Sequence, residues 1–284
     1  MILVTGATGN IGSELVKQLV AKGAPVRVIT RDEKKVSNLA PAVEAVIGDR
    51  HDPNIVRKAL QGVDKVFLLP VILDPGHKAD RLLIDEAKRA GVDHFVMISS
   101  EVVSTNPTNP IGALHREVEV LIEETGIPWT VLRPGGFMSN ALLWWADTIK
   151  SQATVFHSTG HGKTAPISPY DIAAVAAVAL TSSGHQGKTY DLTGSELLST
   201  QEQVQILSKV IGKPLKCVDT PVEVAADGMK SRGFPEPLIA ALTDLWIQVS
   251  KNQGTFQTNE VERLTGRPAQ TFETWCYEHR SAFV

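Results

Sequence analysis

The sequence predicts an α/β fold, a doubly wound parallel sheet followed by a smaller C-terminal α+β lobe. First, short apolar runs rich in β-branched residues alternate with amphipathic helical patterns over the first half of the 284 residues. This pattern is typical of parallel sheets with helices on both faces. Second, the alternation weakens after about residue 140, where helical patterns punctuated by prolines replace it. We therefore expect a main domain of residues 1–140 and about 164–195, and a smaller lobe of residues 196–284 to which residues 141–163 contribute.

The composition is that of an ordinary globular protein. Apolar residues make up 43% of the chain and the net charge is −3 at pH 7, which argues against a broad nucleic-acid-binding surface. The only cysteines, Cys217 and Cys276, are too few for a disulfide framework. No apolar run reaches membrane-spanning length, and a strand that begins at residue 2 leaves no room for a signal peptide. We expect a cytoplasmic protein without nucleic-acid or membrane partners, and a homodimer is left open.

The first strand, Ile2–Thr5, runs into a glycine-rich turn and then into an amphipathic helix that continues to Lys22. The first glycine of the turn allows a tight bend, the second lets a pyrophosphate approach the backbone, and the third lets the helix pack closely on the strand. The positive end of the helix then faces the anion. This spacing predicts a Rossmann-type dinucleotide site like that of short-chain dehydrogenases/reductases. The residues expected to contact the cofactor here are Gly6, Thr8, Gly9, Asn10, Ile11 and Gly12.

The other elements of the main domain follow in order. Further strands are expected at Val26–Thr30, Val43–Ile47, Lys65–Leu69, His94–Ile98, Pro128–Leu132 and Lys188–Leu192. Helices are expected from Asp52-Pro53 to Gln61, and at Lys78–Ala90, Ile111–Glu124 and Asp171–Leu180. In the smaller lobe we expect a helix at Ala141–Lys150 and, after Thr200, helices with one short strand near Leu215–Val218. Ligands bind outside the carboxyl ends of the strands in such sheets, so the loops there hold the candidate site.

The residues after the second strand distinguish NADP from NAD. A Rossmann site places a carboxylate there for the ribose 2′-hydroxyl of NAD, or an arginine for the 2′-phosphate of NADP. Arg31 directly follows the strand and can hold a phosphate with its fork of N–H donors. The alternative is that Asp32 is an NAD carboxylate and Arg31 a solvated charge. We favour NADPH over NADH. Asp49, after the third strand, either accepts a hydrogen bond from the adenine amine or is simply a turn residue.

Several motifs in their order and spacing resemble the NmrA-like group of atypical short-chain dehydrogenases/reductases. These motifs are Val4–Gly12, Arg31, Gly48-Asp49, Ser99-Ser100 and Thr130–Asn140. The resemblance covers about residues 1–195. The group contains NADPH-dependent quinone oxidoreductases and triphenylmethane dye reductases, and it also contains regulators that bind a dinucleotide without known catalysis.

The main short-chain group uses a Tyr-x-x-x-Lys pair, in which the lysine lowers the pKa of the tyrosine. The tyrosines here are Tyr170, Tyr190 and Tyr277, and no lysine stands four residues after any of them. In the NmrA-like reductases the corresponding helix resembles His-x-x-x-Glu, which His115 and Glu119 match, although Val120 replaces the lysine that often follows. His115 can supply a proton at neutral pH, or it is a surface or capping residue. Glu119 is expected to be structural or solvated.

Further cofactor contacts are expected at the carboxyl ends of the fourth, fifth and sixth strands, and those after the fifth and sixth strands are expected near the nicotinamide. The contacts at the three strand ends are Leu69, Ser99, Gly135, Gly136, Phe137 and Asn140. The two glycines permit close approach of the backbone, and the amide of Asn140 offers hydrogen bonds. The alternative is that the serine merely ends a strand and that the glycines form an ordinary strand-to-helix turn.

Phe137, Trp144 and Trp145 are the candidates for binding the substrate. Adjacent helical residues point about 100° apart, so at most one of the two tryptophans faces the core. The other either lines a flat aromatic pocket or packs between the lobes. His157 and His161 have no metal-ligand pattern around them, and no metal site is expected.

These observations predict an NADPH-dependent reductase that transfers hydride to a conjugated small-molecule acceptor such as a quinone, an enone or a dye. Such acceptors delocalise the charge that arrives with the hydride, which fits the absence of the Tyr-x-x-x-Lys pair. The alternative is a non-catalytic regulator that senses the NAD(P) redox state and acts through a protein partner, because the fold alone does not separate the two.

Overall fold

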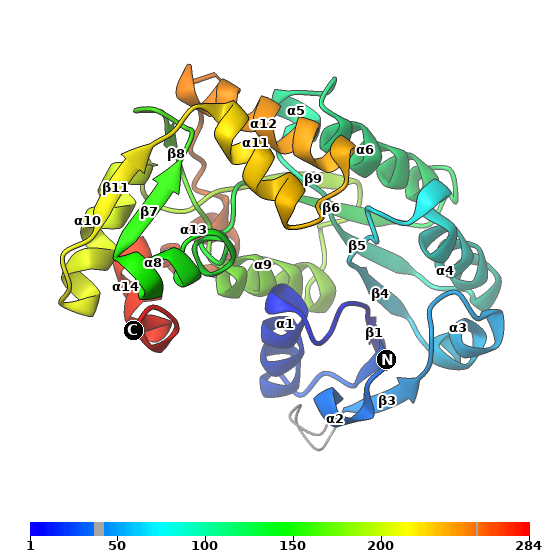
Figure 1. Ribbon diagram of the computed structural model, residues 1–284. Helices are drawn as coiled ribbons and strands as arrows, with labels where there is room; N and C mark the ends of the chain where they lie inside the picture. The colour runs from blue at the N-terminus through cyan, green and yellow to red at the C-terminus, as the bar shows by residue number, and fades with distance from the viewer. Residues whose placement is uncertain (37–42, 254) are drawn as a thin grey trace.

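The computed structural model describes residues 1–36, 43–253 and 255–284. Its central sheet has seven strands in the order β3-β2-β1-β4-β5-β6-β9, all parallel (Figure 1). The strands are β1 Ile2–Val4, β2 Val26–Thr30, β3 Glu44–Ile47, β4 Lys65–Leu68, β5 His94–Ile98, β6 Trp129–Pro134 and β9 Lys188–Leu192. The chain runs outward from β1 to β3 and returns to β4 on the other side of β1. The carboxyl ends of β1 and β4 therefore form the crevice where such sheets bind ligands, and the predicted doubly wound α/β fold is confirmed.

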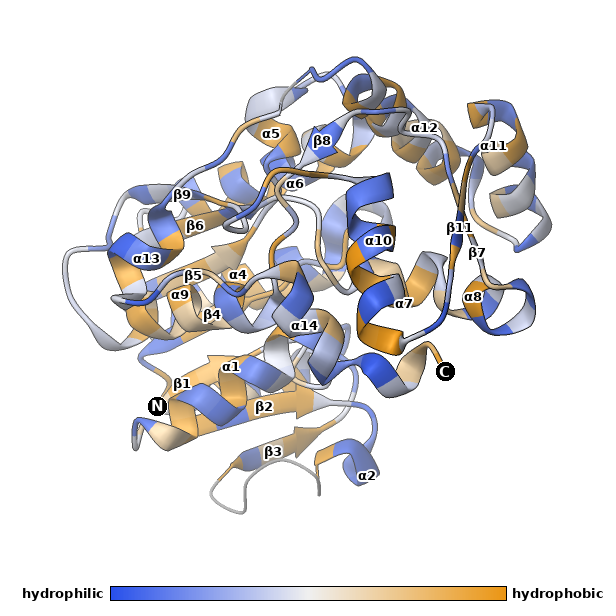
Figure 2. Ribbon diagram, turned by 90° about the vertical axis from the view of Figure 1, so that its left-hand side faces the viewer, coloured by the Kyte–Doolittle hydropathy of each residue, from blue (hydrophilic) through white to orange (hydrophobic). Residues whose placement is uncertain are grey.

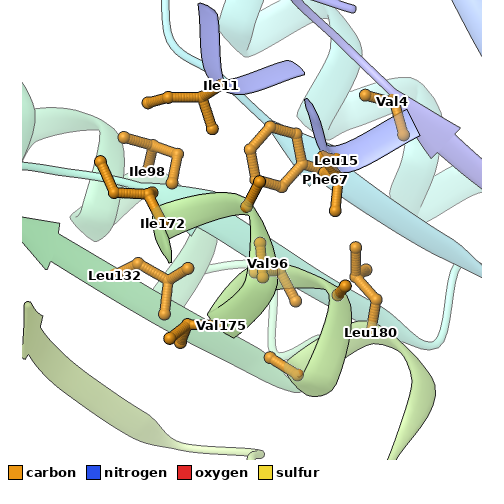
Figure 3. Close-up of a cluster of buried hydrophobic side chains, with 14 of the residues drawn as sticks. Val4, Ile11, Leu15, Phe67, Val96, Ile98, Leu132, Ile172, Val175 and Leu180 are labelled. Atoms are coloured by element: carbon orange, nitrogen blue, oxygen red, sulfur yellow. The ribbon is translucent and has the colours of Figure 1, made fainter. Parts of the chain in front are cut away.

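Helices cover both faces of this sheet. One face carries α1 Asn10–Ala21 and α9 Pro169–Thr181 side by side, and the other carries α3 Pro53–Leu60, α4 Lys78–Ala90 and α6 Pro110–Glu123. Figure 3 shows the first of these interfaces, where Leu15 of α1 lies in the same buried cluster as Phe67 and Val96 of the strands. On the other face, Phe95 and Met97 belong to the cluster that includes α3, α4 and α6. The inner strands β1, β4, β5 and β6 are largely buried, which explains their nearly continuous apolar runs.

Polar residues fix where several helices begin. The side chain of Asp52 accepts a hydrogen bond from the backbone N–H of Asn54 at 2.8 Å, with Pro53 in the first turn of α3. Asn109 caps α6 in the same way, at 2.9 Å from the N–H of Ile111. These caps satisfy backbone donors that have no partner within the helix. The start of α3 at Asp52-Pro53, which the sequence predicts, is confirmed.

The smaller lobe contains two short sheets and a core of its own. β7 Thr154–His157 pairs in parallel with β11 Lys216–Asp219, and β8 Lys163–Thr164 pairs antiparallel with β10 Leu198–Ser199. A buried cluster around Ile149 and Trp275 fills the space beneath them. In Figure 2, α10 carries hydrophobic and hydrophilic residues, as suits a helix that covers a core on one side only. The helices after β6, apart from α9, are α7 Asn140–Trp144, α8 Ala146–Gln152, α10 Thr200–Ile211, α11 Val222–Ser231, α12 Glu236–Ser250, α13 Glu260–Thr265 and α14 Phe272–Glu278.

The remaining elements are short, and three of them lie before β6. They are α2 Glu33–Val36, α5 Val102–Thr105 and the 3₁₀ turns Pro75–His77 and Arg280–Ala282. Within the described ranges, no helix combines the length and apolar character needed to cross a bilayer.

The lobe differs from its predicted structure at α7–α8 and in its strands, because β7, β8 and β10 are not predicted. The sequence predicts one helix over Ala141–Lys150, but α7 ends at Trp144 and α8 begins at Ala146, with Trp145 between them at a φ of −115°. The strand expected near Leu215–Val218 is confirmed as β11, but its partner β7 is absent from the prediction. β7 is four residues long and becomes a strand by pairing with a segment far along the chain, which no local pattern indicates.

Candidate active site

In the glycine turn after β1, close packing excludes a side chain at Gly12 but leaves room for one at Gly9. A Cβ atom at Gly12 would lie 2.2 Å from the carbonyl oxygen of Gly6, so the close packing of α1 on this turn excludes any side chain there. Gly6 itself has a φ of 64°, which favours glycine. A Cβ atom at Gly9 would lie 3.4 Å from that same oxygen, an ordinary contact. A ligand that lies against the backbone at Gly9 explains the missing side chain, and the turn therefore fits a pyrophosphate.

The surroundings of the turn suit an anion. Thr8, Gly9 and Asn10 are exposed, and α1 has no acidic residue in its first turn and no side-chain cap. The first N–H groups of a helix lack intrahelical partners and carry its positive end. Leu69 forms one wall, because its side chain lies where a Cβ atom of Gly6 would be, and its backbone N–H donates to the Thr5 hydroxyl at 2.8 Å.

Arg31 and Asp49 lie together at the far end of this edge. Both are exposed, and they are close enough for the charge of Arg31 to contribute to lowering the pKa of Asp49, after the larger effect of hydrogen bonds from His51. The carboxylate of Asp32 accepts a hydrogen bond from the backbone N–H of Lys34 at 3.0 Å. Asp32 therefore has a structural role at the start of α2, whereas Arg31 extends into solvent beside the expected adenosine end.

Ser99 belongs to a buried network behind the edge of the sheet. Its hydroxyl donates to Glu119 at 2.5 Å, and Arg133 donates to both oxygens of the same carboxylate at 2.9 and 2.7 Å. Burial raises the pKa of Glu119, but the hydrogen bonds from Arg133 and Ser99 outweigh it, and the pKa is lowered overall. Glu119 is 1% exposed and acts as a structural carboxylate, and the Ser99 hydroxyl is engaged with it.

His115 differs from its expected protonation state. Its ring is half-buried on α6, and Nδ1 has no hydrogen-bond partner in the part of the chain that the structure describes. Burial lowers the pKa of His115 to about 4, by more than the nearby Glu119 carboxylate raises it. A desolvated imidazole is neutral at neutral pH, so these surroundings do not favour the expectation that His115 supplies a proton there. His115 also does not line the cavity described next.

A cavity of about 560 Å³ lies between the carboxyl edge of the sheet and the smaller lobe. Phe137, Trp144 and Trp145, which the sequence suggests for substrate binding, all line it, as do Gly136 and Asn140 from the expected nicotinamide loop. The structure thus brings these five residues together. Other lining residues come from the lobe and include His157, Lys163, Arg232 and Trp246.

One wall of the cavity is aromatic. The ring of Trp144 meets Trp246 edge to face at 5.9 Å between centroids, and it also contacts Phe234 at 5.7 Å. The guanidinium of Arg232 lies 5.6 Å from the centroid of the Trp144 ring. Trp145, one residue further on, packs against the core of the lobe as well as lining the cavity. The two tryptophans therefore divide between the two roles that the sequence leaves open.

The loop that follows β6 is held by main-chain hydrogen bonds. The N–H of Gly135 donates to the carbonyl of Leu192, and the carbonyl of Gly136 accepts from the N–H of Ile167, both at 2.9 Å. A Cβ atom at Gly135 would lie 2.8 Å from the Oε2 atom of Glu101. Glu101 is absent from the residues that the sequence suggests, although its position directly after Ser99-Ser100 at the end of β5 places it at the ligand edge. Burial raises the pKa of Glu101 to about 7.

The fold and the site define a dinucleotide-dependent oxidoreductase of the atypical short-chain type. Residues 6–183 match the family described as NAD(P)H-binding, and the chain belongs to this family, with the expected NmrA-like resemblance confirmed. Over its whole length the chain is 37% identical to an NAD(P)H azoreductase of Xenophilus azovorans, covering 99% of that protein. It is 38% identical to a (4-alkanoyl-5-oxo-2,5-dihydrofuran-3-yl)methyl phosphate reductase of Streptomyces griseus, again over 100% of this chain and 99% of that protein.

A solved structure agrees with these relatives. The NADPH-dependent quinone oxidoreductase of Escherichia coli in complex with NADPH superimposes with a TM-score of 0.86 at 29% identity, covering 98% of this chain and 99% of that one. NAD(P)H binding is therefore a property of the family to which the chain belongs.

Proposed function

We propose that the protein is an NADPH-dependent reductase that transfers hydride to a conjugated acceptor such as a quinone, an enone or a dye. The observation that carries this proposal is the aromatic cavity, which opens beside the Gly136–Asn140 loop on the same edge of the sheet as the glycine turn. A reduced nicotinamide bound along this edge supplies the hydride. The residues of the chain bind it, orient the acceptor and exclude water.

Arg31 supports the preference for NADPH. It follows β2 at the position where an arginine holds a 2′-phosphate, and its guanidinium is exposed. Asp32, the competing NAD ligand, already uses one carboxylate oxygen at the start of α2. The other expected cofactor contacts are part of the same proposal. The glycine turn binds the pyrophosphate with Leu69 beside it, Asp49 lies at the adenine end, and Ser99 and the loop Gly135–Asn140 lie at the nicotinamide end.

The shape and chemistry of the cavity favour flat, conjugated molecules. Phe137, Trp144 and Trp246 offer ring faces and edges against which such a molecule stacks. α11 and α12 supply part of the wall of this cavity. The names of the relatives mention azo compounds, an oxo-dihydrofuran and quinones. All three contain conjugated multiple bonds that accept hydride and spread the resulting charge.

A screen of NADPH oxidation against quinones, enones, azo dyes and triarylmethyl dyes tests this function. We expect at least one class to be reduced with NADPH consumed in equal amount, and NADH to be the poorer donor. Tight NADPH binding without oxidation by any acceptor would contradict the proposal and favour the redox-sensing regulator. The cytoplasmic location and the absence of nucleic-acid and membrane partners remain predictions. Whether the protein forms a homodimer is left open.

A further inference from the structure

The main chain of Glu101 is fixed at the carboxyl edge of the sheet. This residue lies between β5 and α5, and its N–H donates to the carbonyl of Pro134 at the end of β6, at 3.1 Å. Its own carbonyl accepts from the N–H groups of Ser104 and Thr105, at 2.9 and 3.0 Å. Bonds on both sides hold the backbone, so the side chain starts from a defined position between two strand ends.

The carboxyl group of Glu101 is directed to the cavity. It lies against Gly135, whose missing side chain leaves the space that Oε2 occupies. The backbone N–H of Gly136 donates to it, and Glu101 lines the cavity together with Gly136 and Phe137. In the described part of the chain, Glu101 forms no ion pair. Its carboxyl therefore faces the same space as the proposed acceptor, with one main-chain donor and no counter-ion.

The charged groups around Glu101 do not compensate its charge. Among the described residues, Asp191 on β9 is the charge that acts on the Glu101 carboxyl, and it opposes ionisation. Arg133 on β6 is held by both oxygens of Glu119, and Lys163 across the cavity pairs with Glu202 at 2.8 Å. Asp244 of α12 accepts hydrogen bonds from the side chains of Asn106 and Asn109. The other charged or titratable groups around the cavity are His157 of β7 and Arg232, which lies beside Trp144.

These surroundings change the acidity of Glu101. Burial, and secondly the Asp191 charge, raise the pKa of the Glu101 carboxyl to about 7, against a smaller opposing effect of the Gly136 hydrogen bond. An ordinary glutamate is ionised at neutral pH, whereas this one is protonated in a substantial fraction of molecules. The contrast with Glu119 is direct, because three hydrogen-bonding partners keep that carboxylate ionised.

We propose that Glu101 is the general acid that protonates the acceptor when hydride arrives, an inference that rests on the proposed function. Hydride leaves the reduced nicotinamide with its electron pair and forms a new bond on the acceptor, whose oxygen or nitrogen takes up the electron pair displaced from the conjugated system. The O–H bond of Glu101 then breaks, and its proton forms a bond to that atom. The nicotinamide is oxidised, the acceptor is reduced by two electrons, and the Glu101 carboxylate regains a proton from water.

The test compares Glu101→Gln with the wild type across pH, using menadione as a quinone and malachite green as a triarylmethyl cation. A quinone needs a proton as well as hydride, whereas the dye cation becomes neutral by gaining hydride alone. Glutamine keeps the shape of the side chain and the acceptor for the Gly136 N–H. We expect kcat/KM for menadione to fall by about 10²–10⁴, as for loss of a general acid, and to fall by less than tenfold for the dye.

The pH dependence provides a second measurement. In the wild type, kcat/KM for menadione should decline above about pH 7, because only protonated Glu101 is active. This decline should be absent in Glu101→Gln and should move to lower pH in Asp191→Asn, since removing a negative charge lowers the pKa of Glu101. Glu124→Gln, which removes an exposed carboxylate at the end of α6, is the matched control and should keep the wild-type profile.

A measurement without turnover separates the two proposals. Carbon-13 NMR of the glutamate carboxyls should show one group that titrates near pH 7 in the wild type and is missing in Glu101→Gln. Absence of this titration, or equal menadione turnover by wild type and Glu101→Gln at every pH, would overturn the assignment of Glu101 while leaving the reductase function intact. A wild type that reduces no acceptor would overturn the reductase function and, with it, the role of Glu101.

Discussion

The glycine turn and the cavity lie on the same edge of the sheet, yet the chain builds them in opposite ways. The turn is one continuous segment, residues 6–12, whose geometry depends on contacts among its own residues and with Leu69. The cavity is assembled from segments between Glu101 and Phe256, which meet through the small β7–β11 and β8–β10 sheets and through α11 and α12. The nucleotide site is thus a local structure, whereas the acceptor site depends on the packing of two lobes.

Among these variants, Gly9→Val is expected to have the largest effect, which is on nucleotide binding at the glycine turn. The structure has room for a Cβ atom at Gly9, but a branched side chain would occupy the space of the pyrophosphate. NADPH binding should be abolished, while far-UV circular dichroism and the melting temperature stay close to wild type. Gly12→Ala is the contrasting variant, because its Cβ atom would meet the Gly6 backbone, and it should lower the melting temperature. Tight NADPH binding by Gly9→Val in calorimetry would show that the pyrophosphate lies elsewhere.

Arg31→Ala should weaken the binding of NADPH more than the binding of NADH. A hydrogen bond to a charged group contributes about 1.5–3 kcal/mol, so NADPH should bind roughly ten- to a hundredfold more weakly. NADH should be almost unaffected, because it has no 2′-phosphate. Lys35→Ala, which removes a neighbouring exposed cation, is the control for general charge. Equal losses of affinity for both nucleotides, measured by fluorescence titration, would mean that Arg31 does not bind the 2′-phosphate.

Trp144→Ala should affect the cavity and leave the nucleotide site unchanged. The ring contributes to an aromatic cluster with Trp246 and Phe234, and aromatic pairs are worth about 0.5–1.5 kcal/mol each. We expect the KM for a good acceptor to rise by about three- to tenfold, with the dissociation constant of NADPH unchanged. A change in NADPH affinity of similar size would show that the two sites are not separate in the way that the structure indicates.

The smallest expected effect concerns stability and lies away from both sites. Burial lowers the pKa values of His94 and His115 to about 4, whereas in the unfolded chain they are near 6.5. Between these values the unfolded chain binds more protons than the folded one, so stability falls as pH decreases from about 6.5 to 4. The melting temperature of His115→Gln should decline less steeply over this range than that of the wild type. Parallel curves would show that folding does not lower the pKa of His115.

The local elements are those that the sequence predicts well. The β1–glycine turn–α1 unit follows from residues that are neighbours in the chain, as does the start of α3 at the Asp52 cap. The break at Trp145 and the strand β7 depend on the packing of the lobe, which no short pattern records. His115 illustrates the same limit, because its residue type suggests a titrating group and only its burial on α6 shows that the ring is neutral.

Glu101 was not predictable from its own segment for a similar reason. A glutamate after two serines is ordinary, and its acidity depends on Gly135 at the end of β6 and Asp191 on β9. These residues come from two other strand ends that the parallel sheet brings beside β5. The aromatic residues of the cavity wall, in contrast, were visible in the sequence at Phe137 and Trp144, because they lie in the loop and the short helix that follow β6.

The central claim is that a nucleotide held at the glycine turn reduces an acceptor held in the aromatic cavity. A single-turnover experiment, in which NADPH deuterated at the transferred position is mixed with the protein and menadione, tests it most directly. We expect nicotinamide absorbance to decay with a primary deuterium isotope effect, and Trp144→Ala to slow this decay at low menadione concentration without changing NADPH binding. NADPH that binds but is not oxidised, or a decay unaffected by deuteration and by Trp144→Ala, would contradict the claim.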